Sequence, residues 1–310
     1  MNIAVIDLGT NGFRLVIAKN TVTPSRDDAE SIKGGSFTVI HRVAKELQLA
    51  SAGIHHIGNA PFQRGLNAMH FFADVLKKYN VLKVKAFATA ALRIADNGQH
   101  FIQTVYEQTG IAIELISGDR EAELIYKGMR ISVPLSNEPV LMVDIGGGSV
   151  EFIIANNEKM LWAKSFNVGV AILKQRFHHN DPITEKEIDT IKAFLDHETA
   201  LFIQQLPIFK PQTPIIASGT LDYIVKILRG GYEQPFSEIP DTALNAIYDR
   251  LVYLSIAELK AIPEVPADKI EMNTVCMVLM AWIMEKMQSS MLIASRNSMK
   301  TGVLQELSEA

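Results

Sequence analysis

The sequence has few of the features that indicate a secreted or membrane-spanning protein. It contains one cysteine, Cys276, in 310 residues, which excludes a disulfide within the chain and is consistent with a reducing compartment. The chain enters its first predicted strand directly, without the basic start and apolar run of a signal peptide. Its most apolar long segment, Met272–Met284, is shorter than the roughly 20 residues of a membrane span and predicts a buried helix. We therefore expect a cytoplasmic protein.

Neither sign of charge is in large excess. The 30 basic and 34 acidic residues give a net charge of −4, which provides no general attraction for nucleic acid or for an anionic membrane. Hydrophobic residues make up 48% of the chain and charged residues 21%, as in globular proteins with a large core. The length allows about two domains. A polyanionic ligand would therefore need local positive potential from arginines, backbone amides or a metal.

No segment matches a Walker loop, a dinucleotide-binding fingerprint or a serine-nucleophile elbow. Val140–Ala155, VLMVDIGGGSVEFIIA, instead predicts a strand that ends at Asp144, a tight turn and a second strand. The turn consists of Gly146, Gly147, Gly148 and Ser149. Because glycine lacks a Cβ, a ligand can approach the backbone N–H groups of such a turn. A turn of this kind beside one acid suits a phosphate together with a metal or an oriented water.

The same pattern occurs at the start of the chain. Ile3–Ala18, IAVIDLGTNGFRLVIA, overlays Val140–Ala155 without a gap and places Asp7 on Asp144. Its turn consists of Gly9, Thr10, Asn11 and Gly12, with Gly9 falling on Gly146. One glycine turn is weak evidence, but the same acid-ended hairpin twice in one chain indicates duplication. We expect two similar lobes, each presenting one phosphate-binding hairpin to a shared cleft.

Strands and helices alternate along the rest of the chain, which predicts α/β layers. The predicted helices are Pro61–Tyr79, Thr89–Ala95, Phe101–Gln108, Asp119–Met129, Ile183–Leu206, Thr242–Leu259, Lys269–Gln288 and Ser298–Leu307. Thr21–Ser36 is predicted to be a loop, and Arg229–Pro240, with two glycines and two prolines, is the most linker-like segment. We expect an N-terminal lobe at 1–126, a C-terminal lobe at 127–297, and a last helix at 298–310 that packs back on the first lobe.

Asp7, Asp144, Arg14 and Arg93 are candidate functional residues because they lie near strand ends and turns. Asp7 and Asp144 could also have only a structural role, since aspartate often caps a turn through its side chain. Their matched positions favour holding a divalent cation or orienting a water. Arg14 follows the first turn and Arg93 follows a strand end. Most arginines are solvated, but a guanidinium at a strand end opening onto a cleft matches phosphate geometry.

Two further positions stay open when judged by spacing alone. Glu121 lies in the first turn of its helix with Asp119 and Glu123, and acids favour helix starts because of the helix dipole. Spacing therefore does not select Glu121. Gly219 and Thr220 follow a short strand, and they fit a third phosphate or nucleotide contact as well as an ordinary strand-to-helix turn.

Five segments together resemble the exopolyphosphatase/guanosine pentaphosphate phosphatase family. They are IDLGTNGFRL (Ile6–Leu15), FATAALR (Phe87–Arg93), ISGDREAELIYKG (Ile116–Gly128), VDIGGGSVEF (Val143–Phe152) and ASGTLDYI (Ala217–Ile224). They follow the family's order and span most of the chain. The GDREAELIYKG helix is the specific part, because kinases of the same fold lack it. The resemblance implies a two-lobed actin-like ATPase fold, shared with sugar kinases and heat-shock chaperones, with duplicated ribonuclease H-like lobes and a cleft between them.

The resemblance also implies roles for particular residues. It makes Glu121 and Asp144 catalytic, and Mg²⁺ the cofactor, and the matched acid Asp7 joins Asp144 and Glu121 as a candidate metal ligand. The resemblance implies that Asn11, Arg14, Arg93, Gly146 and Ser149 bind phosphate. The two turns and the strand end before Ser218 add Gly9, Thr10, Gly12, Gly147, Gly148, Gly219 and Thr220 as candidate phosphate-binding residues. The sequence departs from the family's usual pattern at Gly12, Gln48, Ser218 and Lys300, where serine, arginine, glycine and arginine are common.

The expected function is an exopolyphosphatase that uses Mg²⁺ to hydrolyse the terminal phosphate of inorganic polyphosphate. Hydrolysis of guanosine pentaphosphate (pppGpp) is the alternative, and a regulator that binds guanosine penta- or tetraphosphate without turnover is an alternative of another class. We expect no nucleic-acid partner and no membrane, and a homodimer is compatible with the family. Longer members continue with a helical domain, so we expect short polyphosphates to be handled relatively well.

Overall fold

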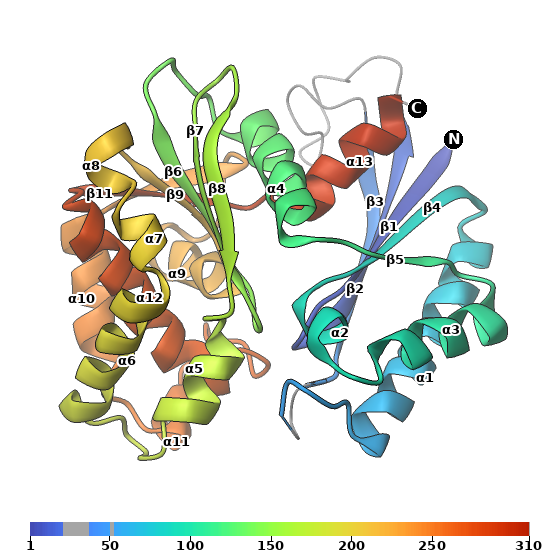
Figure 1. Ribbon diagram of the computed structural model, residues 1–310, viewed down its shortest axis with the longest axis horizontal. Coiled ribbons are helices and arrows are strands. Elements are labelled where there is room, and N and C mark those ends of the chain that lie inside the picture. The colour runs from blue at the N-terminus through green and yellow to red at the C-terminus, as the bar shows by residue number, and fades with distance from the viewer. Residues whose placement is uncertain (21–36, 50–52, 310) are drawn as a thin grey trace. The chain divides into compact units, whose positions relative to one another are not determined.

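Figure 1 shows the protein as a computed structural model, which describes residues 1–20, 37–49 and 53–309. The chain forms two compact units, one of Met1–Ser132 with Ser298–Ala310 and the other of Val133–Asn297. The boundary expected between residues 126 and 127 falls inside helix α4 (Gly118–Ser132), which belongs wholly to the first unit. The predicted loop Thr21–Ser36 lies outside the described residues.

The first unit is built on one mixed sheet. Its strands are β1 (Asn2–Leu8), β2 (Gly12–Asn20), β3 (Phe37–Glu46), β4 (Val81–Ala88) and β5 (Ile113–Leu115). They lie in the order β3-β2-β1-β4-β5. β1, β2 and β3 are antiparallel neighbours, whereas β4 runs parallel to β1 and β5 parallel to β4. The central strand β1 is therefore the one that ends at Asp7 and Leu8.

Helices cover both faces of this sheet (Figure 1). They are α1 (Asn59–Lys78), α2 (Ala90–Ile94), α3 (Gly98–Thr109), α4 and α13 (Met299–Glu309). Ala4, Ile6 and Leu8 of β1 belong to one core with apolar residues of α1 and α3. Because side chains alternate along a strand, Asp7 lies on the opposite face, which α13 covers.

The second unit contains a six-stranded sheet. Its strands are β6 (Val140–Ile145), β7 (Val150–Ala155), β8 (Met160–Phe166), β9 (Pro214–Ala217), β10 (Phe236–Pro240) and β11 (Met291–Ser295). Their order is β10-β11-β9-β6-β7-β8. β6, β7 and β8 are antiparallel neighbours, while β9 is parallel to β6 and β11 to β9.

The two sheets share one topology, which confirms the duplication. Each starts with an antiparallel meander and continues with two parallel strands on the other side of the first strand, and β10 is an extra edge strand in the second unit. Even an irregularity is repeated. The register between the second and third strands shifts at Ile17/Ala18 in one unit and at Ile154/Ala155 in the other. These residues also coincide in the gap-free sequence overlay.

The most apolar helix of the second unit, α12, packs against α5, α6, α9, α10 and α11. The helices of this unit are α5 (Val170–Phe177), α6 (Glu185–Glu198), α7 (Ala200–Ile203), α8 (Leu206–Phe209), α9 (Gly219–Arg229), α10 (Asp241–Leu251), α11 (Ile256–Lys260) and α12 (Ile270–Met287). Leu141 and Val143 of β6 point into the core that α12 shares with α6 and α9. Asp144 therefore lies on the other face of its sheet, as Asp7 does in the first unit.

Two predicted helices are broken in the structure. The expected helix Ile183–Leu206 is interrupted after Glu198, where the hydroxyl of Thr199 donates to the carbonyl oxygen of Leu195 at 2.7 Å. Helix α8 then begins at Leu206, with Pro207 in its first turn. The expected helix Thr242–Leu259 is two helices, because Ser255 and Glu258 form a capping box that begins α11. Both predictions followed the apolar spacing and overlooked these start and stop signals.

The linker-like segment is also partly regular. Arg229–Pro240 contains β10, which pairs with β11 in antiparallel fashion at the edge of the sheet. The edge explains why Pro240 is tolerated, since a proline has no N–H to donate to a further strand. Val170–Phe177, for which the sequence predicts no element, forms α5.

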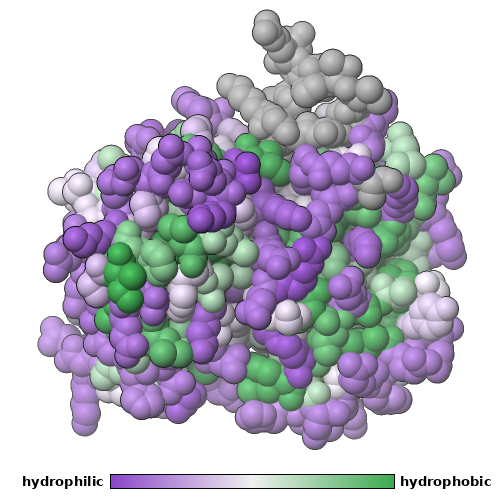
Figure 2. Space-filling model, turned by 45° about the horizontal axis from the view of Figure 1, so that its top comes forward, coloured by the Kyte–Doolittle hydropathy of each residue, from purple (hydrophilic) through white to green (hydrophobic). Residues whose placement is uncertain are grey.

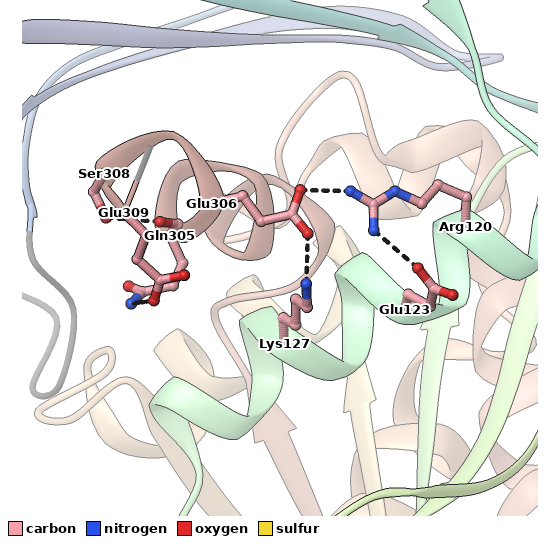
Figure 3. A network of polar contacts seen from close by, with 7 residues as sticks. All are labelled: Arg120, Glu123, Lys127, Gln305, Glu306, Ser308 and Glu309. Carbon is pink, nitrogen blue, oxygen red and sulfur yellow. Dashed lines mark hydrogen bonds and ion pairs between the residues drawn. The ribbon is translucent and has the colours of Figure 1, made fainter.

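Helix α13 packs on α4 at a point where two glycines meet the opposite backbone. A Cβ on Gly302 would lie 2.0 Å from the carbonyl oxygen of Leu124, and one on Gly128 would lie 2.0 Å from that of Ser298. Beside this crossing, Glu306 accepts hydrogen bonds from Arg120 Nη2 at 2.5 Å and from Lys127 Nζ at 2.6 Å (Figure 3). The position of α13 on the first unit is therefore fixed by backbone contact and by an ion-pair network.

We predict that Glu306→Gln weakens the docking of α13. Partial burial opposes the charged form of Glu306, but the hydrogen bonds from Lys127 and Arg120 outweigh it and lower the pKa of this carboxyl. Loss of the charge should cost about 1 kcal/mol of unfolding free energy. Thermal unfolding would measure it, with Glu309→Gln on the same helix as the control, since Glu309 pairs with Gln305 and not with a cation. Equal melting temperatures for both variants would contradict this account.

A second carboxylate organises the loop before α6. Glu187 accepts hydrogen bonds from the backbone N–H groups of His179, Asn180 and Thr184 and from the hydroxyl of Thr184, at 2.8 to 3.0 Å. Desolvation raises the pKa of Glu187, but these hydrogen bonds prevail and lower it to about 2, against 4.5 for the unperturbed group. The ionised form therefore stabilises the folded unit.

We predict that Glu187→Gln destabilises the protein in a pH-dependent manner. Because the pKa is depressed on folding, the contribution of Glu187 is complete above about pH 4.5 and is lost as the pH falls toward 2. The variant should lose about 1 kcal/mol near neutral pH, as for other helix caps, and less at low pH. Urea unfolding between these limits would test this, with Glu185→Gln in the same helix turn as the control. A pH-independent difference would rule out the proposed role of the charge.

On the face shown in Figure 2, apolar side chains gather in several groups that are separated by hydrophilic ones. The most exposed large apolar residues of the described chain include Leu82, Ile208 and Tyr106. Single apolar residues of this kind are ordinary on a folded protein and identify no interface. None of the helices in the described part of the chain is both long and apolar enough to span a membrane.

Candidate active site: two acid-ended hairpins

The sequence-predicted residues of the first unit follow one edge of its sheet. β1, β4 and β5 are parallel, so their carboxyl ends lie at the same edge. Asp7 is near the end of β1, Arg93 is in α2 just after β4, and Glu121 is in α4 just after β5. Edges of this kind are where ligands bind in open α/β sheets. The structure therefore brings the candidate acid, base and arginine of this unit to one place.

The first turn is held in position through its carbonyl groups. Asn11 O accepts hydrogen bonds from the N–H groups of Leu47 and Gln48 at 2.8 and 2.9 Å, and Thr10 O accepts one from Leu49 at 3.0 Å. Fixing these carbonyls fixes the planes of the peptide groups, and with them the directions of the turn's N–H groups. Gln48 makes its bond with a positive φ of 49°, a conformation rare for residues other than glycine.

The close approach of β3 explains the glycine at position 12. A Cβ on Gly12 would lie 2.5 Å from the carbonyl oxygen of Lys45 and 3.2 Å from the Cα of Glu46. The departures at Gly12 and Gln48 are therefore connected, because the segment that carries Gln48 can pack directly against Gly12 only if Gly12 has no side chain. The turn thereby lacks the hydroxyl that a serine at position 12 would provide.

We predict that Gly12→Ser destabilises the first unit, although serine is common at this position in the resembling family. The added Cβ meets backbone atoms that cannot move without disturbing the pairing of β2 with β3. The expected cost is about 1 to 3 kcal/mol, as for other overpacked sites. Thermal unfolding would measure it against Gly9→Ala, whose Cβ would come no closer than 3.3 Å to another atom. Equal stabilities would contradict the packing explanation.

Asp7 is buried and has cationic neighbours. Arg14 is its direct partner across the β1–β2 hairpin, so their side chains leave the same face of the sheet. The ammonium of Lys300, in the first turn of α13, donates to Asp7 Oδ2 at 3.2 Å. Arg14 also reaches Glu46, with 3.9 Å between Nη2 and Oε1. The acid of the first hairpin is thus paired with one ammonium, while the guanidinium on the same face of the sheet is paired with Glu46.

Glu121 is held by an arginine at the same edge. Its Oε2 lies 3.4 Å from Arg93 Nη1, which also donates to the carbonyl oxygen of Ile116 at 2.8 Å. Only 7% of Glu121 is exposed, whereas acids that merely favour a helix start are normally solvated. Burial and the contact with Arg93 therefore distinguish Glu121 from Asp119 and Glu123, which spacing alone did not.

The second turn is tied down in the same manner as the first. The carbonyl oxygens of Gly146 and Gly147 accept hydrogen bonds from the N–H groups of Val170 and Ala171, at the start of α5, at 3.0 and 2.9 Å. Gly169 lies so close that a Cβ there would be 2.3 Å from Gly147 O. Helix α5, which the sequence analysis missed, therefore supports the phosphate-binding turn predicted in this unit.

Glu151 is a candidate functional residue that the sequence analysis missed. It is the direct partner of Asp144 across the β6–β7 hairpin, and only 2% of it is exposed. Its Oε1 accepts a hydrogen bond from the hydroxyl of Ser165 at 2.7 Å. The signal was present in the overlay of the two hairpins, because Glu151 falls on Arg14. At matched positions, one hairpin carries an arginine and the other a glutamate.

Gly219 and Thr220 begin α9 at the carboxyl edge of the second sheet, where β9 pairs in parallel with β6 and aligns Ala217 with Asp144. Ser218 accepts a hydrogen bond from the N–H of Thr220 at 3.2 Å and caps this helix. Its backbone is extended, with φ −163°, so a glycine is not required there.

Lys269 is a second residue that the sequence analysis missed. Its Cε lies 2.8 Å from the position of a Cβ on Gly219, and its Nζ lies 3.3 Å from that position. Nothing in the local sequence connects these two residues, because only the packing of the start of α12 beside α9 brings them together. Cys276 on α12 lies 3.4 Å from Ser218 Oγ, and burial raises the pKa of its thiol, consistent with a core residue.

The carboxylates present fit a hard divalent cation. Among the described residues, no three His, Cys, Asp or Glu side chains gather at one point. Mg²⁺ normally uses one or two carboxylates and completes its shell with water and substrate phosphate. Asp144 and Glu151 leave one face of a hairpin with Cβ atoms about 5 Å apart, and two such carboxylates repel one another unless a cation or proton lies between them. These two residues are thus suitable Mg²⁺ ligands.

Comparison with known proteins gives the family. The family model described as the Ppx/GppA phosphatase family matches residues 29–309. The chain belongs to the Ppx/GppA phosphatase family. It has the actin-like ATPase fold of that family, and its two units are the duplicated ribonuclease H-like lobes of this fold. Phosphatases of the Ppx/GppA family generally depend on a divalent metal.

Several relatives are similar over most of the chain. A guanosine-5'-triphosphate,3'-diphosphate pyrophosphatase of Pseudoalteromonas atlantica is 31% identical over 232 residues, which are 73% of this chain and 42% of that protein. The chain therefore spans less than half the length of this curated relative. The crystal structure of an exopolyphosphatase from Cytophaga hutchinsonii matches with a TM-score of 0.91 and 29% identity over 100% of this chain and 98% of that chain.

A Ppx/GppA family member from Aquifex aeolicus has the same fold. It matches with a TM-score of 0.79 and 21% identity over 99% of this chain and 97% of that chain. The fold predicted from the five sequence segments is thus confirmed over the length of the chain.

Proposed function

We propose that this protein is a divalent-metal-dependent phosphohydrolase that removes the terminal phosphate of inorganic polyphosphate. The main support for this proposal is Glu121, a buried carboxylate that contacts Arg93 at the carboxyl edge of the first sheet. A carboxylate in that position can accept a proton from water, and a neighbouring guanidinium can bind a phosphoryl oxygen. Family membership and the two matched hairpins support this reading.

In the proposed reaction, a water molecule attacks the terminal phosphorus. Glu121 accepts the water's proton, the bond from phosphorus to the bridging oxygen breaks, and the products are orthophosphate and a chain shorter by one phosphate. Arg93 and Arg14 bind the non-bridging oxygens of the transferring group. The N–H groups of the turns at Gly9–Gly12 and Gly147–Ser149 do the same, and their fixed orientation lowers the cost of reorganisation in the transition state.

Asp144 and Glu151 would hold the metal. A bound Mg²⁺ supplies positive charge to phosphoryl oxygens during the transfer. Asp144 stays a proposed catalytic residue on this account, and Gly219 and Thr220 stay proposed contacts for more distal phosphates. Lys269, beside Gly219, supplies a cation that a polyanionic chain can bind. We propose that both hairpins act on the same substrate.

The share of each relative's length that matches this chain supports polyphosphate over pppGpp as the substrate. The exopolyphosphatase from Cytophaga hutchinsonii matches over nearly the whole of both chains. The curated pyrophosphatase matches over 42% of its length, although its identity of 31% keeps guanosine pentaphosphate as the second candidate substrate. Both compounds present a terminal phosphoanhydride to the same turns.

We predict that Glu121→Gln lowers phosphate release from polyphosphate by at least about 100-fold while the protein remains folded, because the amide cannot accept the proton. The matched control is Glu123→Gln on the same helix, whose carboxylate pairs with Arg120 instead, and it should retain activity. Circular dichroism would establish folding. Near-normal release by a folded Glu121→Gln protein would exclude Glu121 as the base.

The same assay separates the candidate functions. Phosphate release from polyphosphate and from pppGpp would be compared side by side with Mg²⁺ and after its removal by a chelator. A higher kcat/KM for polyphosphate supports the proposal, and a higher value for pppGpp supports the alternative. Tight binding of pppGpp without release of phosphate from either compound would instead indicate a regulator. Activity that persists without divalent metal would contradict the role given to Asp144 and Glu151.

A further inference from the structure

The acid of the first hairpin has a dedicated cation. Lys300 Nζ lies 3.2 Å from Asp7 Oδ2, and the side chain of Asp7 is only 11% exposed. Arg14, the partner of Asp7 across the hairpin, lies on the same face of the sheet but is itself paired with Glu46, so Lys300 is the cation in direct contact with Asp7. A buried carboxylate normally requires such a counter-charge.

The position of Lys300 on its helix is unfavourable except for this contact. It is in the first turn of α13, where the positive end of the helix dipole disfavours a cation, and that turn contains no acidic residue to offset the charge. Lys300 is not free to adjust through movement of the helix, because Gly302 meets the backbone of α4 and Glu306 is anchored by Arg120 and Lys127. The helix therefore carries the ammonium to Asp7.

The matched acid in the second unit has a carboxylate, not a guanidinium, across its hairpin. Asp144 faces Glu151 across its hairpin, where Asp7 faces Arg14. A divalent cation is attracted far more strongly to two neighbouring carboxylates than to a carboxylate whose charge an ammonium already neutralises. Two hairpins with one ancestral pattern thus differ in the sign of the charge beside their aspartates.

We propose that Lys300 is the permanent counter-ion of Asp7, so that Asp7 is a positioning residue and not a metal ligand. This inference rests on the proposed function. It assigns the metal to the second hairpin and only phosphate to the first. Neutralising Asp7 matters because an unpaired carboxylate beside the first turn would repel the phosphate that the turn's N–H groups bind. Asp7 was expected from the sequence to bind metal, and its pairing with Lys300 argues against that role.

Metal binding tests the inference without activity. Isothermal titration with Mn²⁺ would compare the wild type, Asp7→Asn and Asp144→Asn. We expect Asp144→Asn to weaken Mn²⁺ binding by at least about fivefold more than Asp7→Asn does, since only the former removes a ligand. A smaller ratio between the two variants, or a larger loss in Asp7→Asn, overturns the inference.

A double-mutant cycle that neutralises Lys300 and Asp7 tests the role of Lys300 in phosphate binding. Lys300→Met leaves Asp7 negative and should raise the KM for tripolyphosphate by about tenfold, with a smaller change in kcat. Lys300→Arg should restore a KM near that of the wild type. The double variant Asp7→Asn/Lys300→Met, which is neutral again, should have a lower KM than Lys300→Met alone, because the two effects are coupled.

A purely structural role of Lys300 predicts different results. The double variant would then be at least as impaired as Lys300→Met, and this outcome overturns the proposal, as does a Lys300→Arg protein no better than Lys300→Met. Thermal unfolding would show which variants fold. If the wild type releases no phosphate from polyphosphate, the proposed function fails, and the comparison of Asp7→Asn with Asp144→Asn in Mn²⁺ binding still decides this inference.

Discussion

The central constraint on this protein is that β1 and β6 each carry an aspartate one residue before the strand ends, and a glycine turn whose carbonyls are already bonded follows the strand. In the first unit, the backbone after β3 binds Thr10 and Asn11, and in the second the start of α5 binds Gly146 and Gly147. Once the carbonyls are fixed, the N–H groups of the turn have one orientation. The glycines are needed where backbone meets backbone, as at Gly12 in one unit and Gly169 in the other. The hydrogen bonds to the carbonyls of each turn therefore orient its N–H groups as a binding site for anions.

Duplication and divergence together give the two hairpins different tasks. The shared strand order and the shared register shift show how closely the units correspond. Their difference lies in the side chains beside the acids, with Arg14 and Lys300 near Asp7 and Glu151 near Asp144. On our proposal, the first hairpin binds phosphate and the second holds the metal, and Glu121 activates the water. This division requires no change in the backbone, only a change in the sign of charge at matched positions.

The sequence predicted the fold and much of the candidate site because those features are local. The acid-ended hairpins, the alternation of strands and helices and the helix that carries Glu121 can all be read from consecutive residues. Contacts between distant segments could not be predicted, among them Lys300 with Asp7 and Lys269 with Gly219. Glu151 is predictable from the overlay, because it falls on Arg14, and each of these residues is the partner of its acid across the hairpin. The broken helices show the same limit, since apolar spacing continued across Thr199 while its hydroxyl bonded the preceding turn. Whether the two hairpins face a common cleft stays a prediction.

The most direct test of the account is the location of Mn²⁺ in crystals of this protein grown with tripolyphosphate, determined by anomalous scattering. The account predicts a peak beside the carboxylates of Asp144 and Glu151, with Lys300 still paired to Asp7 and phosphate at the first turn. A peak coordinated by Asp7, with the ammonium of Lys300 displaced, would contradict it.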